Sequence, residues 1–189
     1  MTEQDEKEWI KRARAGDQIA FGNLVSAYQS PVYNLAYRML GSPMEAEEAA
    51  QEAFIRAYKY LNSYDINRPF STWLLSITSH YCIDLLRRRR LKLFSLDDES
   101  TGAYRISNDS PTPETVVRRR ELSDHMQELL VQELSPIDRA AVTLLYWYDH
   151  SYEEIADVLD LTVSAVKSRL YRARRTLAEA MEGENLYAV

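Results

Sequence analysis

The chain has 189 residues, of which 46% are hydrophobic and 28% charged, and its formal net charge is −6 at pH 7. This length and apolar content allow one or two compact domains. An acidic protein is poorly suited to bind DNA unaided, because basic groups that displace counterions supply much of the affinity for DNA. Cys82 is the single cysteine and the three histidines are scattered, which excludes a disulfide framework and a cysteine-based zinc site.

Segment composition bears on location and fold class. The chain shows no signal peptide and no apolar run of membrane-spanning length, so we expect a cytoplasmic protein, and nothing indicates a cofactor. Long segments with apolar residues at helical spacing, with only five glycines and six prolines, predict an all-α protein. Positive charge is concentrated in residues 87–92 and 167–175. In an acidic chain, that distribution indicates DNA binding that needs a partner protein.

The first helices are expected over residues 3–15 and 20–40. Pro31 lies inside the second pattern and is expected to kink that helix or split it in two. After Pro43, which suits a first helical turn, a third helix is expected over residues 44–61. Acidic and amide side chains gather near its N-terminus, where they favour the helix dipole. They are Glu45, Glu47, Glu48, Gln51 and Glu52.

This acidic surface has two explanations that composition does not separate. It is either a solvated face or a face that docks on a partner. A di-metal carboxylate site would use Glu-x-x-His pairs, and no histidine lies between residues 44 and 61. A helical enzyme that uses these carboxylates on a metal is therefore the weakest alternative.

The segment FSTWLLSITSHYCIDLLRRRRLK predicts a further helix, with Ser71 or Thr72 as its cap. Aromatic rings lie just before or beside the arginine run 87–90, and rings interleaved with arginine suit the stacking and phosphate contacts of single-stranded DNA. Alternatively, Phe70 and Trp73 are core residues, and arginines are favoured at any helix C-terminus. The rings are those of Tyr64, Phe70, Trp73 and Tyr81.

Residues 94–115 differ in character from the rest of the chain. They are polar, acidic and rich in Ser, Asp and Pro, without apolar periodicity, so we expect a flexible linker. Helical patterns resume at Val116. The sequence therefore predicts two small helical domains, residues 1–93 and 116–189, on either side of that linker.

The segment SYEEIADVLDLTVSAVKSRLYRARRTL, residues 151–177, predicts two helices joined by a tight turn. Ser151 followed by Glu154 is the pattern of a capping box. Asp160 falls where the turn needs a left-handed residue, a conformation that Asp tolerates. Thr162 can cap the second helix. Together these features predict a helix-turn-helix.

The second helix of this motif has one apolar and one polar face. Residues 163–177 contain five basic side chains and no acidic one. A helix that buries one face and offers small polar residues and arginine on the other suits the major groove of DNA. The alternative is a solvated basic helix in an ordinary bundle. The outward residues are Ser164, Ala165, Lys167, Ser168, Arg169, Tyr171, Arg172 and Arg175.

Three segments resemble the extracytoplasmic-function (group IV, ECF) sigma factors of bacterial RNA polymerase, in the sigma-70 superfamily. They are YRMLGSPMEAEEAAQEAFIRAY, FSTWLLSITSHYCIDLLRRRR and LSPIDRAAVTLLYWYDHSYEEIADVLDLTVSAVKSRLYRARRTL. The loop SYDINRPFSTWL is especially similar to that of the sigma-W type. The resemblance covers essentially the whole chain. It implies a sigma factor that directs promoter-specific transcription initiation, often in a stress response, and that has no catalytic residues.

The resemblance also implies roles for the parts. Residues 1–93 correspond to sigma region 2, which docks on the β′ clamp helices of core RNA polymerase and binds melted bases of the −10 element. Residues 116–189 correspond to region 4, which binds the −35 element and contacts the β flap, while the linker passes through the polymerase. An anti-sigma factor, often tethered to the membrane, is an implied partner. The docking residues implied are Glu45, Glu47, Glu48, Gln51, Glu52 and Phe54, and those for the −10 element are Tyr64, Asn67, Phe70, Ser71, Trp73, His80, Asp84, Arg87 and Arg88.

The outward residues of 163–177 would contact the −35 element. Some positions depart from the family pattern: Asp160-Leu161 replaces a Leu-Gly-like pair, Ser164-Ala165 replaces Gly-Thr, and His80 stands where Asn is frequent. These departures bear on the promoter sequence rather than on the class. The remaining alternative is a stand-alone dimeric helix-turn-helix regulator, which predicts a two-fold operator and tight binding without polymerase.

Overall fold

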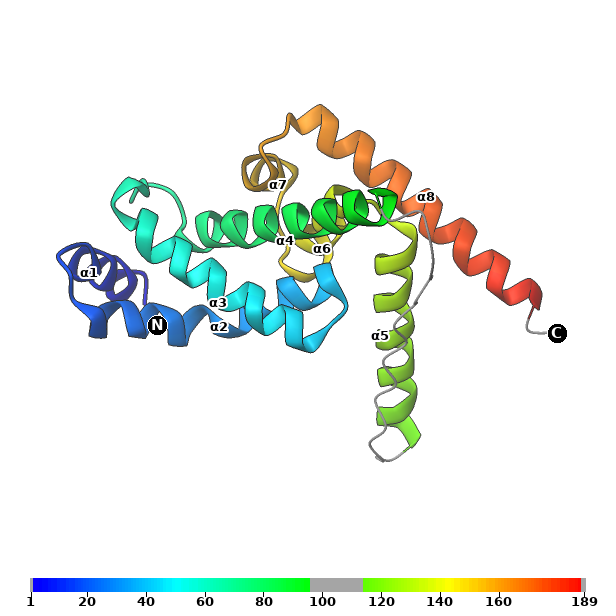
Figure 1. Ribbon diagram of the computed structural model, residues 1–189, viewed down its shortest axis with the longest axis horizontal. Helices are drawn as coiled ribbons and strands as arrows, with labels where there is room; N and C mark the ends of the chain where they lie inside the picture. The colour runs from blue at the N-terminus through cyan, green and yellow to red at the C-terminus, as the bar shows by residue number, and fades with distance from the viewer. Residues whose placement is uncertain (1, 96–113, 188–189) are drawn as a thin grey trace.

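The computed structural model describes the backbone of residues 2–95 and 114–187 and the side chains of residues 2–91 and 124–182. Within these ranges every regular element is helical, as the sequence predicts (Figure 1). None of these helices is both long and apolar enough to cross a membrane. In chain order they are α1 (Glu3–Arg14), α2 (Gln18–Leu40), α3 (Pro43–Tyr60), the 3-10 turn η1 (Leu61–Ser63), α4 (Phe70–Ser95), α5 (Glu114–Glu133), α6 (Pro136–Trp147), α7 (Tyr152–Leu159) and α8 (Val163–Tyr187).

Local signals explain where the first helices begin and end. The Asp17 carboxylate accepts hydrogen bonds from the first backbone N–H groups of α2, and Ser42 caps α3 in the same way. Gly41 closes α2 at φ +74°, a conformation that glycine adopts without strain. Pro31 lies inside α2. Of the two expected outcomes, a kink or a split, the split does not occur: α2 is continuous from Gln18 to Leu40.

The start of α4 corrects one prediction. The helix begins at Phe70, so Ser71 and Thr72 lie in its first turn and are not its caps. The Pro69 carbonyl accepts the N–H of Trp73 at 3.3 Å. Proline is favoured at a helix start because its missing N–H would have no partner there.

Helices α4 and α5 also enter the predicted linker. Helix α4 continues to Ser95 and α5 begins at Glu114, so each includes two residues of the range predicted as linker. The rest of the predicted linker, residues 96–113, lies outside the described residues.

Two hydrophobic clusters hold the helices together. The first belongs to α1–α4 and η1 and includes Ile10, Leu24 and Phe70, each no more than 1% exposed. The second joins the C-terminal half of α2, the start of α3 and one side of α4 to α5–α8, and it includes Leu35 and Leu144. Burying each such side chain contributes about 1.5–3 kcal/mol. The N-terminal and C-terminal helices therefore share a core.

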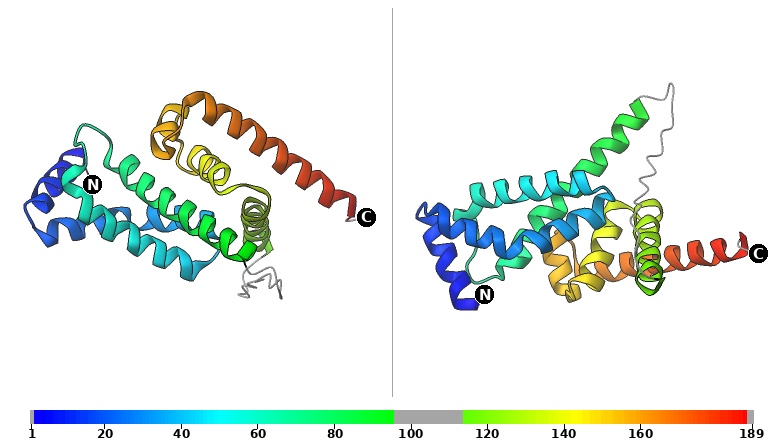
Figure 2. Two further views of the ribbon diagram at one scale, coloured as in Figure 1. Left: turned by 45° about the horizontal axis from the view of Figure 1, so that its top comes forward. Right: turned by 90° about the horizontal axis from the view of Figure 1, so that it is seen from below.

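Helix α4 occupies the centre of the molecule. It packs on α2 and α3 on one side and on α6 and α7 on the other (Figure 2, left). Cys82 lies on this helix within the shared core, where burial raises the pKa of its thiol to about 12. Helix α8 crosses α6 and α7 and then extends away from the other helices (Figure 1).

Candidate nucleic-acid interface and docking groove

The helix-turn-helix predicted at residues 151–177 is present as α7 and α8. The Ser151 N–H donates to the Glu154 carboxylate at 2.7 Å, and the Glu154 N–H donates to the Ser151 hydroxyl at 3.2 Å, so the capping box is complete. The Ser151 N–H, and after it the Ser151 hydroxyl that donates to the same carboxylate at 2.9 Å, hold the pKa of the Glu154 carboxyl below its usual value. Asp160 adopts φ +54° and ψ +51°. Thr162 accepts the Ala165 N–H at 3.2 Å. Each local prediction for this turn is confirmed.

Helix α8 presents a basic face to solvent. Its inward side chains Val166, Leu170 and Ala173 are buried against α6 and α7. On the opposite side Tyr171 is 69% exposed. Most of the predicted outward residues are likewise exposed, namely Ser164, Lys167, Ser168, Tyr171, Arg172 and Arg175.

Two of the predicted −35 residues are half-buried, Ala165 and Arg169. The Arg169 guanidinium donates to the Asp138 carboxylate at 2.8 Å and so joins α8 to α6. Asp138 also accepts the Ser135 hydroxyl that caps α6. Arg169 is therefore held toward the body of the helix-turn-helix domain, whereas Arg172 lies on its open surface.

A second exposed stripe runs along α4. His80, Asp84, Arg87 and Arg88 are exposed and share one face because they are three or four residues apart. Nη1 of the Arg87 guanidinium lies 3.9 Å from Oδ1 of Asp84. Asn67 lies ahead of this stripe in the exposed loop that precedes α4, where its N–H and side-chain amide donate to Asp65.

The aromatic residues predicted for the −10 element are not on that stripe. Tyr64 is 5% exposed and Phe70 1%, and their rings meet edge to face at 5.4 Å. The Trp73 side chain is half-buried, and the centroid of its ring lies 4.9 Å from that of the Tyr64 ring. Ser71 is also half-buried. The rings of Tyr64 and Phe70 thus form the floor under the loop, a position that agrees with the core alternative for Phe70.

Arg14 anchors the same loop, and sequence reasoning missed it. Its Nε donates to the Leu61 carbonyl at 3.0 Å, and Nη2 donates to the Tyr64 carbonyl. The guanidinium also lies 5.6 Å from the Tyr64 ring centroid. No local pattern marks this contact, because Arg14 and Tyr64 are 50 residues apart.

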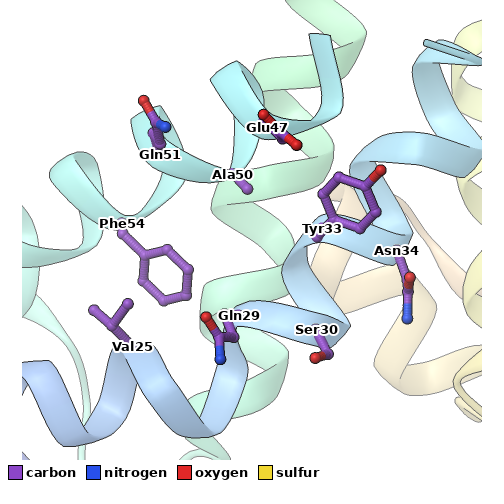
Figure 3. A pocket seen from close by; sticks show the side chains of 9 residues that line it. All are labelled: Val25, Gln29, Ser30, Tyr33, Asn34, Glu47, Ala50, Gln51 and Phe54. Carbon is purple, nitrogen blue, oxygen red and sulfur yellow. The ribbon is translucent and has the colours of Figure 1, made fainter. Parts of the chain in front are cut away.

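A groove of about 470 Å³ runs between α2 and α3 (Figure 3). Phe54 points from α3 toward Val25 of α2, and Glu47 and Gln51 lie along the α3 rim (Figure 3). These three α3 residues are among those predicted to dock. The α2 wall was missed by sequence reasoning, because contact between two helices leaves no pattern within either. It consists of Val25, Gln29, Ser30, Tyr33 and Asn34.

The other predicted docking residues lie outside the groove. Glu48 is exposed. Glu45 forms an ion pair with Arg89 of α4, and Glu52 pairs with Arg56 at 2.7 Å. The acidic surface of α3 is therefore partly neutralised within the protein, and the groove rim retains Glu47 as its carboxylate.

In the residues that the structure describes, a helix-turn-helix is combined with a second exposed helix face, an arrangement typical of DNA-binding proteins. Residues 24–92 match the family model for Sigma-70 region 2, and residues 128–177 match that for Sigma-70 region 4. The chain is 39% identical to the ECF RNA polymerase sigma factor SigW of Bacillus subtilis over 181 residues, which span 93% of this chain and 96% of that protein. It therefore belongs to the extracytoplasmic-function sigma factors of RNA polymerase.

Other relatives extend this agreement. The RNA polymerase sigma-H factor of Pseudomonas aeruginosa is 30% identical over 187 residues, 96% of each chain. A structure of CnrH in complex with the cytosolic domain of CnrY shares the fold, with a TM-score of 0.68 and 24% identity over 95% of this chain and 98% of that chain. The protein is thus a transcription initiation factor that binds core RNA polymerase and promoter DNA, and sigma factors are not enzymes. These matches set aside the stand-alone regulator.

Proposed function

We propose that residues 1–93 dock on core RNA polymerase and bind the −10 element, that residues 94–115 connect the two parts, and that residues 116–189 bind the −35 element. The observation that carries this division is the pair of exposed faces on α4 and α8, which lie on different domains and have different chemistry. The two promoter elements are inferred from family membership, and the roles of single residues on each face are inferred from the exposure and contacts of their side chains.

The −35 contacts come from the exposed face of α8. Arg172 and Lys167 are exposed on its acid-free side, so they can reach phosphates or base edges in the major groove. Arg169 is a positioning residue, because its guanidinium is occupied by Asp138. The flank of this domain contacts the β flap of the polymerase.

The −10 contacts come from the loop before α4 and from the exposed stripe of that helix. Asn67, His80 and Arg88 are accessible to a single strand. Ser71 and Trp73 are half-buried at the helix start and contact the strand through their open edges. Tyr64 and Phe70 support the loop from below rather than stack on bases.

Docking on the β′ clamp helices uses the groove between α2 and α3. Phe54 and Val25 provide an apolar floor, while Gln51 and Glu47 provide hydrogen-bonding groups along the rim. An apolar groove with a polar rim is the arrangement that binds the exposed face of a partner helix. Glu48 extends this surface beyond the rim. Glu45 joins α3 to α4 through its ion pair with Arg89, and Glu52 pairs with Arg56 one turn further along α3.

An anti-sigma factor, membrane-tethered as is frequent in this family, controls the protein within a cytoplasmic stress response. Two neighbours in fold support this partner: CnrH, solved with the cytosolic domain of CnrY, and the sigma factor RpoE of Bartonella quintana, solved with the anti-sigma factor NepR at a TM-score of 0.67. Affinity purification of the chain from unstressed cells, compared with stressed cells, should recover such a protein in the first sample. Its absence from both samples would contradict this partner.

A gel shift on a promoter fragment, with the protein alone, core polymerase alone or both, tests the whole assignment. We expect a specific shift and a run-off transcript with both components only. A tight and specific shift by the protein alone, unaffected by polymerase, would favour the dimeric regulator.

The docking groove has its own test. The double variant Gln51→Ala/Phe54→Ala should lose the transcript while keeping the helical content of the wild type. A matched control is Gln18→Ala/Ile19→Ala, which removes an amide and an apolar side chain from the exposed start of α2; Ile19 is 75% exposed and lies outside the groove. Normal transcription by a folded groove variant would refute the docking assignment.

A further inference from the structure

A second cavity, of about 540 Å³, lies where α2, the start of α4 and the end of α6 meet. It is separate from the docking groove and shares with it only Ser30 and Asn34, two exposed residues of α2. Its volume is in the range of sites that hold small organic molecules. None of the described residues that line it is an aspartate or a glutamate, and most are apolar or aromatic, namely Tyr28, Pro31, Leu74, Leu75, Trp147 and Tyr148.

Arg38 gives this cavity a permanent positive charge. Its guanidinium is half-buried, and its central carbon lies 4.0 Å from the centre of the Trp147 ring. Burial lowers the pKa of the guanidinium below its usual value, because a charged group loses hydration there. In the part of the chain that the structure describes, this guanidinium forms no ion pair with a carboxylate and donates to no oxygen. A partly buried charge without such a partner is unfavourable.

The other arginines whose described side chains are half-buried or buried all have oxygen acceptors. Arg139 donates to three backbone carbonyls, one of them that of Met39 in α2. Carboxylates accept from three more of these arginines, and backbone carbonyls just before α4 accept from the fourth. These four are Arg56, Arg89, Arg169 and Arg14. Arg38 is the exception, because the described residues provide no acceptor for its guanidinium.

The position of Arg38 is fixed by the protein itself. Its backbone carbonyl accepts the Gln127 amide of α5 at 3.1 Å, and Trp147 covers one side of its guanidinium. A guanidinium stacked on a ring keeps its in-plane N–H groups, whose fork matches the two oxygens of a carboxylate. The first turn of α4 also borders the cavity through Ser71. The backbone N–H groups of a first turn and the helix dipole favour a negative charge there.

The rest of the lining indicates what kind of anion fits. Arg38 is the one permanent cation among the described lining residues, which suits a single negative charge better than the nearly two charges of a phosphate. The Tyr28 and Tyr148 hydroxyls already donate to other protein oxygens, and so does Nδ1 of His150. Few donors therefore remain for additional ligand oxygens, whereas the aromatic and aliphatic side chains offer apolar contact.

We propose that this cavity binds a small aromatic carboxylate. Its carboxylate group pairs with the Arg38 guanidinium, and its ring lies against the apolar lining, which includes the buried Leu74 and Leu75 of α4. This site goes beyond the function proposed above and does not depend on it. Arg38 and Trp147 belong neither to the two DNA faces nor to the docking groove.

Isothermal titration calorimetry of the free, full-length chain tests this site. The probe is β-naphthoate, and the uncharged β-naphthamide has the same rings. We expect the naphthoate to bind, and Arg38→Gln to weaken its binding by roughly 10- to 100-fold, as for the loss of charge-assisted hydrogen bonds. The amide should bind more weakly than the naphthoate by a similar factor. The matched control is Arg174→Gln, because Arg174 also lies beside an aromatic ring, that of Tyr146, but outside the cavity. The control should bind naphthoate as the wild type does.

Circular dichroism checks that Arg38→Gln keeps its helices. If it does not, Arg38→Lys replaces it, since the ammonium keeps the charge but lacks the planar fork, and binding should then be weaker than in the wild type but not lost. The proposal is overturned if the wild type does not bind naphthoate at millimolar concentration, if the amide binds equally well, or if folded Arg38 variants bind as the wild type does. Tighter binding of inorganic phosphate than of naphthoate would overturn the aromatic class of ligand. None of these outcomes alters the gel shift, so failure of this site is distinguishable from failure of the proposed function.

Discussion

Helices α4 and α8 both carry an exposed face, and we assign both faces to DNA, but the starts of the two helices are fixed in different ways. The start of α8 is set by caps within a single short stretch, namely the Ser151 box of α7, the left-handed Asp160 and the Thr162 hydroxyl, while its inner face packs on α6 and α7. Helix α4 is set by packing, since buried rings such as Phe70 support its first turn and other helices cover two of its sides. A face fixed by caps depends on hydrogen bonds near the surface, whereas one fixed by packing depends on the core.

The two faces also differ in charge. The α8 face carries no carboxylate from Val163 to Leu177, and its first acidic residue is Glu179, which pairs with Arg175. The α4 stripe includes Asp84 beside its arginines. A purely basic face gains more from counterion release on duplex DNA. The Asp84 carboxylate reduces this gain on the α4 stripe, so we expect that stripe to bind DNA less tightly by itself than the α8 face does.

The largest effect should come from the packed helix. Phe70→Ala removes a ring that is 1% exposed, and such truncations cost about 3–5 kcal/mol. We expect the free energy of unfolding to fall by that amount in urea titrations, with loss of −10 binding. Tyr171→Ala on α8 is the control, since exposed positions change stability by only about 0.5 kcal/mol. If both variants lost the same free energy of unfolding, the contrast between a helix fixed by packing and one fixed by caps would be refuted.

Replacing one arginine on each face by alanine tests which DNA element each face binds. Arg172→Ala should weaken binding of the polymerase complex to −35 duplex by about 1–3 kcal/mol, as for one specific base contact. Arg88→Ala should leave −35 binding unchanged and weaken binding to a single strand that carries the −10 sequence. Competition assays with the two DNA probes measure both. If the two variants exchange these phenotypes, the assignment of the faces is reversed.

Loss of a cap should have a smaller effect. Ser151→Ala removes the N-cap of α7 and should cost about 1 kcal/mol at pH 7. Glu154 has a lowered pKa in the folded state, so its contribution is present above its unfolded value of 4.5 and is lost as pH falls through the lower folded value. Denaturation of wild type and Glu154→Gln across this range checks the sign. If the wild type became more stable relative to Glu154→Gln as the pH falls, this sign would be contradicted.

The smallest expected effect has the opposite sign. Asp160 sits at φ +54°, which costs an L-residue roughly 1–2 kcal/mol, partly offset for Asp. Asp160→Gly relieves that cost, but it also raises the entropy of the unfolded chain, which disfavours folding. We therefore expect a net stabilisation of only about 0.5 kcal/mol. Asp160→Ala keeps the strain and should be less stable than wild type. Thermal melts of the three proteins give the order, and a glycine variant less stable than the alanine variant would show that φ is not the cause.

The contrast between caps and packing also explains what the sequence could predict. The helix-turn-helix was predicted in detail, because Ser151, Glu154 and Asp160 act within a few residues of one another. The helices themselves followed from apolar periodicity. The start of α4 differs from the prediction, because Ser71 and Thr72 have the chemistry of caps, whereas the helix already begins at Phe70 and the Pro69 carbonyl accepts its first hydrogen bond.

Contacts between distant segments were beyond local reasoning. The α2 wall of the groove was missed, as were Arg14 under the loop and Arg139 between two domains. Each depends on which helix faces which, and no short pattern records that. Burial of Tyr64 and Phe70 has the same origin, since aromatic rings are equally suited to a core and to stacked bases.

The bond from Arg139 to Met39 spans 100 residues of chain. During synthesis at about 5–20 residues per second, roughly 5–20 seconds therefore separate the appearance of these two partners. Throughout that interval the last carbonyls of α2 lack the hydrogen bonds from Gln127 and Arg139. The end of α2 is therefore completed only after the C-terminal helices have been synthesised.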